Sequence, residues 1–189
     1  KQSEKFFGYY YLNGIHSLKK SLNEASVDFS DITDVVLTHL HFDHCGGSVK
    51  WNTMKDDYEL TFPNANYWVH ESHWDNAINP NPREKASFLK ENMLPIQESG
   101  HLKFIPENLQ ITDNISGILA QGHTESMFCP KISIGDQTLV FMADMIPSIG
   151  HIKPNYVMGY DIRPLETMKE RESFLKEAVS NEYLLFFEH

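Results

Sequence analysis

Hydrophobic and polar positions in the first part of the chain follow two different spacings. Apolar residues three and four positions apart predict a helix over residues 15–25, and the short apolar run 34–38 predicts a buried strand. Between residues 51 and 110 the pattern becomes irregular and rich in asparagine, proline and aromatic residues. We expect this stretch to be an insertion, whose elements are a strand at 66–70 and helices near 71–77 and 83–92.

The second half of the chain predicts a small sheet that is completed by a crossover helix. Helical spacing over residues 165–179, with Pro164 where a helix would begin, predicts that helix. A strand, a helix and a further strand in this order imply a right-handed crossover and a parallel strand pair. The expected strands are 116–121, 131–134, 137–142 and 183–187, with the turn pair Gly135-Asp136 between the second and the third.

Composition and charge narrow the class of protein. The chain has 189 residues, with 26 Asp and Glu against 16 Lys and Arg, and its formal net charge is -10. This length and pattern predict one α/β domain over residues 1–189. The acidic balance argues against nucleic-acid binding, and the sequence lacks the long apolar run of a membrane span. Two cysteines indicate reduced thiols and a cytoplasmic protein.

Four candidate metal ligands follow the first predicted strand within six residues, namely His39, His41, Asp43 and His44. Imidazole and carboxylate at this density suit a divalent ion such as Zn, Mn or Fe. His39 and His41 point the same way if the extended backbone of the strand continues, whereas the other two lie on the turn that follows. One segment then supplies ligands to two adjacent ions. A polar loop whose histidines form only hydrogen bonds is the alternative, which this spacing disfavours.

Three further residues of ligand type stand at the downstream ends of predicted strands. His123 follows the strand at 116–121, Asp144 follows the strand at 137–142, and His189 ends the chain after the last strand. In an up-down-up meander the first and third strands run the same way, so their ends share one edge of the sheet. The crossover helix brings His189 to that same edge. Sheet topology therefore predicts that all these residues gather at one place.

A few other polar residues are weaker candidates. His70 and His73 lack the spacing of a zincin motif, so we expect them on the surface or behind the ligands. His151 follows Asp144 closely enough to reach the pocket, and Tyr156 and Tyr160 are expected to line it, more in a structural than in a catalytic role.

The motifs resemble those of one known family. Through them the chain looks like a member of the metallo-β-lactamase-fold hydrolase superfamily over roughly residues 30 to 189, and it is most similar to the branch of quorum-quenching lactonases and organophosphate-hydrolase-like enzymes. The resemblance implies an αββα four-layer sandwich, of which we expect part of the N-terminal sheet and the C-terminal tail to be missing here. The motifs are His39-x-His41-x-Asp43-His44, Gly122-His123-Thr124, Ala143-Asp144 and Glu188-His189.

The same resemblance implies a pair of divalent ions, zinc first and manganese or iron as alternatives. Two such ions would share a bridging water and lower its pKa toward neutrality. We therefore expect a binuclear metal-dependent hydrolase whose metal-bridging hydroxide attacks a small ester, lactone or related small molecule. Asp43 would bind metal and also accept a proton during catalysis. The implied ligand sets are His39, His41 and His123 for one ion and Asp43, His44 and His189 for the other, with Asp144 bridging.

Details of the motifs favour some subfamilies over others. An aspartate at position 144 fits lactonases and hydrolases of the glyoxalase II kind, and it argues against true β-lactamases. Glu125-Ser126-Met127 replaces the common Pro-Gly-His continuation, which weakens the match to glyoxalase II. Pro147 stands where one type of small lactonase has a catalytic tyrosine.

Other functions stay open at this stage. They are a mononuclear iron dioxygenase on the same fold with a 2-His-1-carboxylate set, a thioester hydrolase of the glyoxalase II kind, and a binding module without catalysis. The complete set of ligand-type residues argues against the last of these. A small-molecule substrate is expected in each enzymatic case, and an oligomer is left open.

Overall fold

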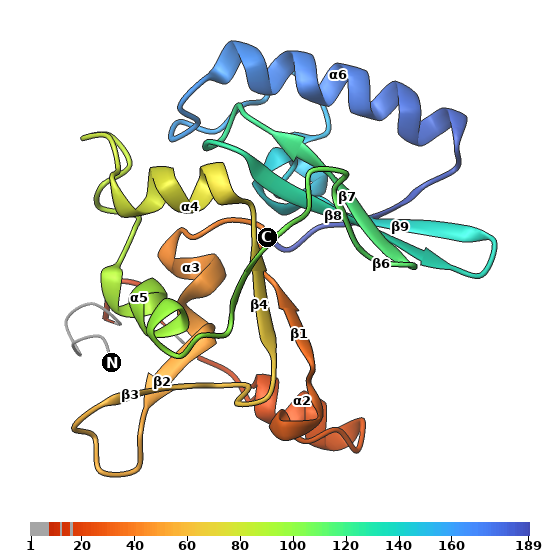
Figure 1. The fold of residues 1–189 in the computed structure, drawn as a ribbon. Coiled ribbons are helices and arrows are strands. Elements are labelled where there is room, and N and C mark those ends of the chain that lie inside the picture. The colour runs from red at the N-terminus through yellow and green to blue at the C-terminus, as the bar shows by residue number, and fades with distance from the viewer. Residues whose placement is uncertain (1–7, 12, 16) are drawn as a thin grey trace.

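The structure is a computed structural model that describes residues 8–11, 13–15 and 17–189. It contains two main sheets and one hairpin (Figure 1). The helices include α2 (Leu18–Glu24), α3 (Phe42–Cys45), α4 (Glu71–Ile78), α5 (Lys90–Glu98) and α6 (Pro164–Ser180), with the 3-10 helices η1 (Phe29–Asp31), η2 (Gly46–Ser48), η3 (Ala143–Met145) and η4 (Ile149–His151). The strands are β1 (Asp34–Val36), β2 (Val49–Trp51), β3 (Tyr58–Leu60), β4 (Asn66–Val69), β5 (Leu102–Phe104), β6 (Gln110–Thr112), β7 (Ile115–Ala120), β8 (Met127–Ile134), β9 (Gln137–Phe141) and β10 (Leu184–Phe186).

The first sheet has the strand order β1-β4-β5, and all its neighbours are parallel. Helices α3, α4 and α5 lie beside it (Figure 1). Alternate residues of β4, Tyr67 and Val69, are buried in the same apolar core as Trp74 of α4 and Met93 and Ile96 of α5. Burying such side chains stabilises the fold by roughly 1.5–3 kcal/mol each. This core holds the segment after β1 in place.

The second sheet has the strand order β10-β9-β8-β7-β6. Strands β7, β8 and β9 form the predicted antiparallel meander, and β10 pairs with β9 in parallel after the crossover through α6. Phe174 and Ala178 of α6 pack in a second core with Met127 and Val140 of the sheet. The expected crossover and parallel pair are confirmed.

The two sheets are connected beside the histidine motif. The backbone N–H of Phe128 in β8 donates a hydrogen bond of 2.8 Å to the carbonyl of Thr38, which follows β1. In the described part of the chain, no helix has the length and apolar content needed to cross a membrane.

The prediction of a helix at 83–92 is wrong in its placement. Residues 82–87 form turns, and helix α5 begins only at Lys90. The side chain of Asn81 accepts hydrogen bonds from the backbone N–H groups of Arg83 and Glu84, at 3.0 and 3.2 Å. Such local side-chain acceptors compete with helix formation. The stretch 51–110 also supplies β4 and β5, so it contributes to the first sheet.

Arg171 of α6 is completely buried and joins the helix to two loops. Its Nε donates to the carbonyl of Met145 at 2.5 Å, and its Nη1 donates to the carbonyls of Tyr156 and His151 at 2.6 and 3.4 Å. A guanidinium group suits this task because its donors lie in a fixed planar fork. The loops that it holds carry Asp144 and part of the pocket wall.

We expect the substitution Arg171→Met to lower the free energy of unfolding by roughly 3 kcal/mol, because it leaves the carbonyl of the buried Met145 without its donor and removes the hydrogen bonds that hold two loop carbonyls. Urea denaturation followed by circular dichroism measures the change. Lys176→Met, on an exposed part of the same helix, serves as the control and should change stability by only about 0.5 kcal/mol. Equal stability of the two variants would contradict this role of Arg171.

Candidate metal centre

The histidine motif lies in the segment that joins β1 to helix α3. His41 is the residue just before α3, and Asp43 and His44 lie within that one-turn helix. Behind the motif, the fully buried ring of His73 accepts a hydrogen bond of 2.8 Å from the backbone N–H of Leu40. Burial lowers the pKa of His73 to about 4, so the ring is neutral and able to accept through Nε2. His73 thus positions the backbone of the motif, as expected for a residue behind the ligands.

The three distant candidates reach the same place from the second sheet. His123 lies in the loop after β7, Asp144 lies in η3 after β9, and His189 follows β10. The Oδ2 atom of Asp144 is 3.1 Å from Nε2 of His123 and 3.4 Å from Nε2 of His44, and Oδ1 is 3.4 Å from Nε2 of His189. The structure therefore brings together the strand ends that the sequence analysis placed at one edge.

The loop that carries His123 is docked against α6. The carboxylate of Glu170 accepts hydrogen bonds from the backbone N–H groups of Gln121 and Gly122, at 2.6 and 3.0 Å. A Cβ atom at Gly122 would overlap the backbone of Thr167, so this close approach requires glycine. On the other side of the site, Ala143 next to Asp144 has φ of 45°, a left-handed conformation that is unfavourable for alanine.

The candidate ligands fall into two groups whose nitrogen and oxygen atoms lie within 4.8 Å of one another inside each group. One group is His39, His41 and His123, and the other is His44, Asp144, Glu188 and His189. The sequence analysis named Glu188 in the motif Glu188-His189 but did not assign it as a candidate ligand. Asp43 borders the second group, since its Oδ2 atom is 3.6 Å from Nε2 of His44 and its side chain is 48% exposed.

Several atoms of the site are buried and lack hydrogen-bond partners among the described residues, as expected for metal ligands. They include Nε2 of His39, Nε2 of His44 and Oδ1 of Asp144. Leaving such groups unpaired is costly unless a cation satisfies them. Imidazole and carboxylate together are a donor set that suits zinc and similar divalent ions. The residues therefore fit a bound metal.

The electrostatics of the site are also suited to a cation. Burial and the neighbouring imidazoles hold the pKa of His39 well below its usual value, so the ring stays in the neutral form that binds metal. Burial opposes ionisation of Asp144, but hydrogen bonding and the adjacent imidazoles outweigh it and lower its pKa. At His44 burial favours the neutral ring, yet the carboxylates of Asp144 and Glu188 raise its pKa to about 10. The second group thus attracts positive charge.

Each of the four buried or half-buried candidate ligand histidines also has a polar neighbour at its second ring nitrogen, and for His44 this neighbour is Glu188 of the same ligand group. Such partners orient metal-binding rings and set their tautomer. Sequence reasoning missed all of them, because most are far from the histidines along the chain. Two of the pairs are hydrogen bonds, Thr38 Oγ1 with His39 Nδ1 at 3.1 Å and Asp161 Oδ1 with His123 Nδ1 at 3.0 Å. The other two are contacts at ion-pair distance, Glu84 Oε1 with His41 Nε2 at 3.6 Å and Glu188 Oε1 with His44 Nδ1 at 3.1 Å.

A cavity of about 630 Å³ opens beside the two groups. Tyr160 lines it with its ring 6.2 Å from that of His123, and His151 lines it with Nδ1 held 2.8 Å from Ser148 Oγ. Tyr156, by contrast, is exposed and outside this lining. The apolar part of the wall comes from Tyr10, Phe42, Pro147, Met158 and Tyr160.

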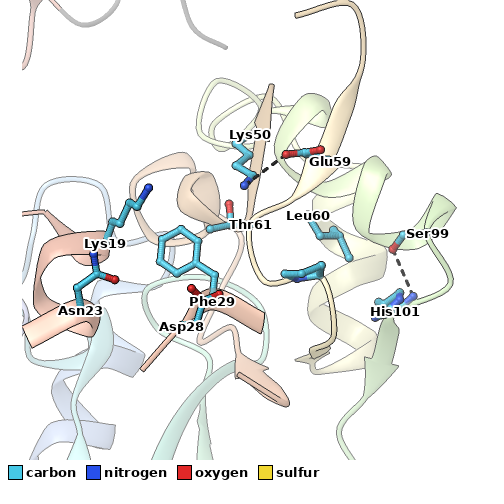
Figure 2. Close-up of a pocket in the computed structure, with 11 residues that line it drawn as sticks. Lys19, Asn23, Asp28, Phe29, Lys50, Glu59, Leu60, Thr61, Ser99 and His101 are labelled. Carbon is cyan, nitrogen blue, oxygen red and sulfur yellow. Dashed lines mark hydrogen bonds and ion pairs between the residues drawn. The ribbon is translucent and has the colours of Figure 1, made fainter. Parts of the chain in front are cut away.

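A second cavity, of about 580 Å³, lies away from the histidine cluster (Figure 2). It is bordered by α2, η1 and the β2–β3 hairpin. Lys50 and Glu59 form an ion pair of 3.3 Å, and the backbone N–H of His101 donates to Ser99 Oγ at 3.4 Å. The predicted metal ligands are not among its lining residues.

Comparison with solved structures supports the fold. A probable metal-dependent hydrolase from Staphylococcus aureus superposes with a TM-score of 0.87 at 24% identity, covering 98% of this chain and 64% of that chain. AidC, a dizinc quorum-quenching lactonase in complex with a product, matches with a TM-score of 0.72 at 30% identity, covering 91% of this chain and 62% of its own. AbOPH, a hydrolase in the beta lactamase superfamily, matches with a TM-score of 0.75 at 21% identity, covering 93% and 62%.

This chain therefore spans less than two thirds of the length of these proteins. No curated protein matched the sequence. A family model described as the metallo-beta-lactamase superfamily matches residues 12–189, which is nearly the whole chain. The mixed α/β fold and the family resemblance expected from the motifs are confirmed. The chain belongs to the metallo-β-lactamase superfamily.

Proposed function

We propose that the protein is a binuclear metal-dependent hydrolase that acts on a small ester or lactone. The observation that carries this proposal is the position of Asp144, which belongs to the second ligand group and whose carboxylate also contacts His123 of the first. Its Oδ2 atom faces His123 and His44, and its Oδ1 atom faces His189. Family membership and the likeness to a dizinc lactonase support the same assignment.

In this proposal His39, His41 and His123 hold the first ion, and Asp43, His44 and His189 hold the second, with Asp144 between them. Zinc suits these ligands best, with manganese and iron as alternatives. Glu188 supports the second position through Nδ1 of His44. Bound divalent ions supply Lewis acidity toward a carbonyl oxygen and a nucleophile that is active near neutral pH. Two separate ligand groups favour this arrangement over the mononuclear iron dioxygenase.

The chain's own residues have further tasks in hydrolysis. Asp43 lines the cavity with a half-exposed carboxylate, so it is placed to accept a proton there as well as to bind metal. Phe42 and Met158 supply apolar contact area for the acyl part of a small substrate and exclude water from the site. Tyr160, on the same wall, offers a phenol hydroxyl for orienting the substrate.

Metal titration tests the two-ion assignment. After the protein is stripped with a chelator, we expect it to bind two equivalents of zinc per chain, and zinc should raise the melting temperature because it binds the folded state. The variants His39→Ala and His189→Ala should each lose one equivalent. His101→Gln, in the cavity of Figure 2, should keep both. A wild-type protein that binds zinc no better than the double variant of His39 and His189 would refute the assignment.

Activity assays test the chemistry. The metal-loaded protein should hydrolyse at least one member of a panel of lactones, esters, thioesters and phosphotriesters. Asp144→Asn should lower kcat/KM by about 100-fold or more, since it removes a charge that holds both metals. Asp43→Asn should lower kcat/KM by roughly 100-fold through loss of a ligand and proton acceptor.

Asp136→Asn, in the exposed turn between β8 and β9, is the matched control and should retain wild-type activity. One iron per chain together with oxygen consumption, and no hydrolysis of any panel member, would instead indicate the dioxygenase alternative.

A further inference from the structure

The turn segment at residues 82–87 places a buried carboxylate beside the metal centre. Glu84 is only 3% exposed although it lies in a turn. Its Oε1 atom accepts a hydrogen bond of 2.5 Å from Thr124 Oγ1, and its Oε2 atom accepts one of 2.5 Å from Asn81 Nδ2. A carboxylate is rarely buried unless it is paired in this way.

The remaining contact of this carboxylate is with a candidate metal ligand. Oε1 of Glu84 lies 3.6 Å from Nε2 of His41. On the other side of the same ring, Nδ1 of His41 lies 3.2 Å from Nε2 of His123, which belongs to the same ligand group. The ring of His41 therefore meets the ligand group through a hydrogen bond at Nδ1 and faces Glu84 through Nε2. Nε2 is buried and forms no hydrogen bond with the described residues, so its contact with the carboxylate is electrostatic, at ion-pair distance.

This orientation of His41 is opposite to that of the other paired histidines. His39, His44 and His123 all meet their polar partners through Nδ1, which leaves Nε2 for the ligand groups. A neutral imidazole carries its proton on one nitrogen only, and the hydrogen bond at one nitrogen selects the tautomer. An acceptor facing Nε2 stabilises the tautomer with the proton on Nε2. The lone pair of Nδ1 is then free to bind metal.

We propose that Glu84 is a positioning residue that holds His41 in the Nε2–H tautomer, with Nδ1 directed at the first metal position. This inference rests on the proposed metal-binding role of His39, His41 and His123. It adds a residue that belongs to neither ligand group and that lies in the stretch between residues 51 and 110.

The same turn also supports a second candidate ligand, His123. Arg83 donates from Nη2 to the carbonyls of Gly159 and Asp161, at 2.8 and 3.2 Å. The carboxylate of Asp161 in turn contacts Nδ1 of His123 at 3.0 Å. Glu84 thus contacts His41 directly, and Arg83 supports His123 through Asp161.

The turn is also tied to the helix that follows the motif. The carbonyl of Ser87 accepts a hydrogen bond of 2.9 Å from the backbone N–H of Phe42, the first residue of α3. Because the turn is fixed at this end too, the carboxylate of Glu84 is held at a constant position relative to His41. Preorganisation of this kind is what a metal site needs from the residues around its ligands.

Zinc binding to the full chain tests the proposal without any substrate. We expect Glu84→Ala to weaken one of the two zinc equivalents by roughly 10–100-fold, measured by competition with a chromophoric chelator. The isosteric Glu84→Gln should weaken the same equivalent by a smaller factor, because an amide oxygen can still face Nε2 of His41 but the negative charge is gone. In both variants the other equivalent should stay close to wild type.

Two variants serve as matched controls. Thr124→Val removes a hydrogen bond to the same carboxylate but leaves the contact with His41, so a merely structural role of Glu84 predicts that this variant behaves like Glu84→Ala. Our proposal predicts near-normal zinc affinity instead. Glu59→Gln makes the same chemical change on the exposed strand β3 and should have no effect on zinc.

Nuclear magnetic resonance of the zinc-loaded protein with ¹⁵N-labelled histidine identifies the tautomer of His41 directly. We expect the wild-type protein to show His41 bound through Nδ1, with a slowly exchanging proton on Nε2. In Glu84→Ala that proton should exchange faster, whereas in Thr124→Val it should stay protected. Thermal melting of each variant verifies that it folds, and Glu84→Gln carries the test if the alanine variant does not.

The possible outcomes separate this inference from the proposed function. Binding of His41 through Nε2 in the wild-type protein would overturn the role of Glu84, and so would wild-type zinc affinity in both Glu84 variants. If either of these two results is found and the wild-type protein still binds two zinc ions and hydrolyses substrate, the proposed function holds and only the role of Glu84 is refuted. If the wild-type protein binds no zinc, both proposals fail.

Discussion

Several imidazole rings are buried around one carboxylate at the point where the two sheets meet. His39 and His123 are almost inaccessible to solvent, and Asp144 is 4% exposed. Atoms of this cluster lack hydrogen-bond partners in the described part of the chain, and water has little access to supply them. In a low-dielectric environment such unpaired groups are costly, and a bound cation compensates that cost. The fold therefore gathers nitrogen and oxygen atoms that lack hydrogen-bond partners at one place, and such atoms are suited to bind a metal ion.

Two sheets meet to build that place. The first sheet supplies the motif after β1, and the second supplies the ends of β7, β9 and β10. The hydrogen bond from Phe128 to Thr38 fixes the two parts against each other. Arg171 and Glu170 then attach helix α6 to the loops that carry Asp144 and His123. Each sheet, held by its own core, thus positions some of the candidate ligands.

Much of the site could be predicted because its signals are local. His39 to His44 stand within a few residues, and an apolar strand precedes each of the three distant candidates, so topology alone places them together. The partners of the rings were not predictable in the same way. Glu84 is 43 positions from His41, and Asp161 is 38 positions from His123, with no pattern in between to connect them. The misplaced helix at 83–92 has the same cause, because Asn81 and Glu84 form tertiary and turn contacts that outweigh helical propensity.

If the seven predicted residues and their neighbours hold two cations on either side of Asp144, anomalous X-ray diffraction from crystals of the zinc-loaded protein will locate both ions. We predict two peaks, one against His39, His41 and His123 and the other against His44 and His189, with the Asp144 carboxylate between them. A single peak, or peaks only at sites remote from Asp144 such as the cavity in Figure 2, would contradict the account.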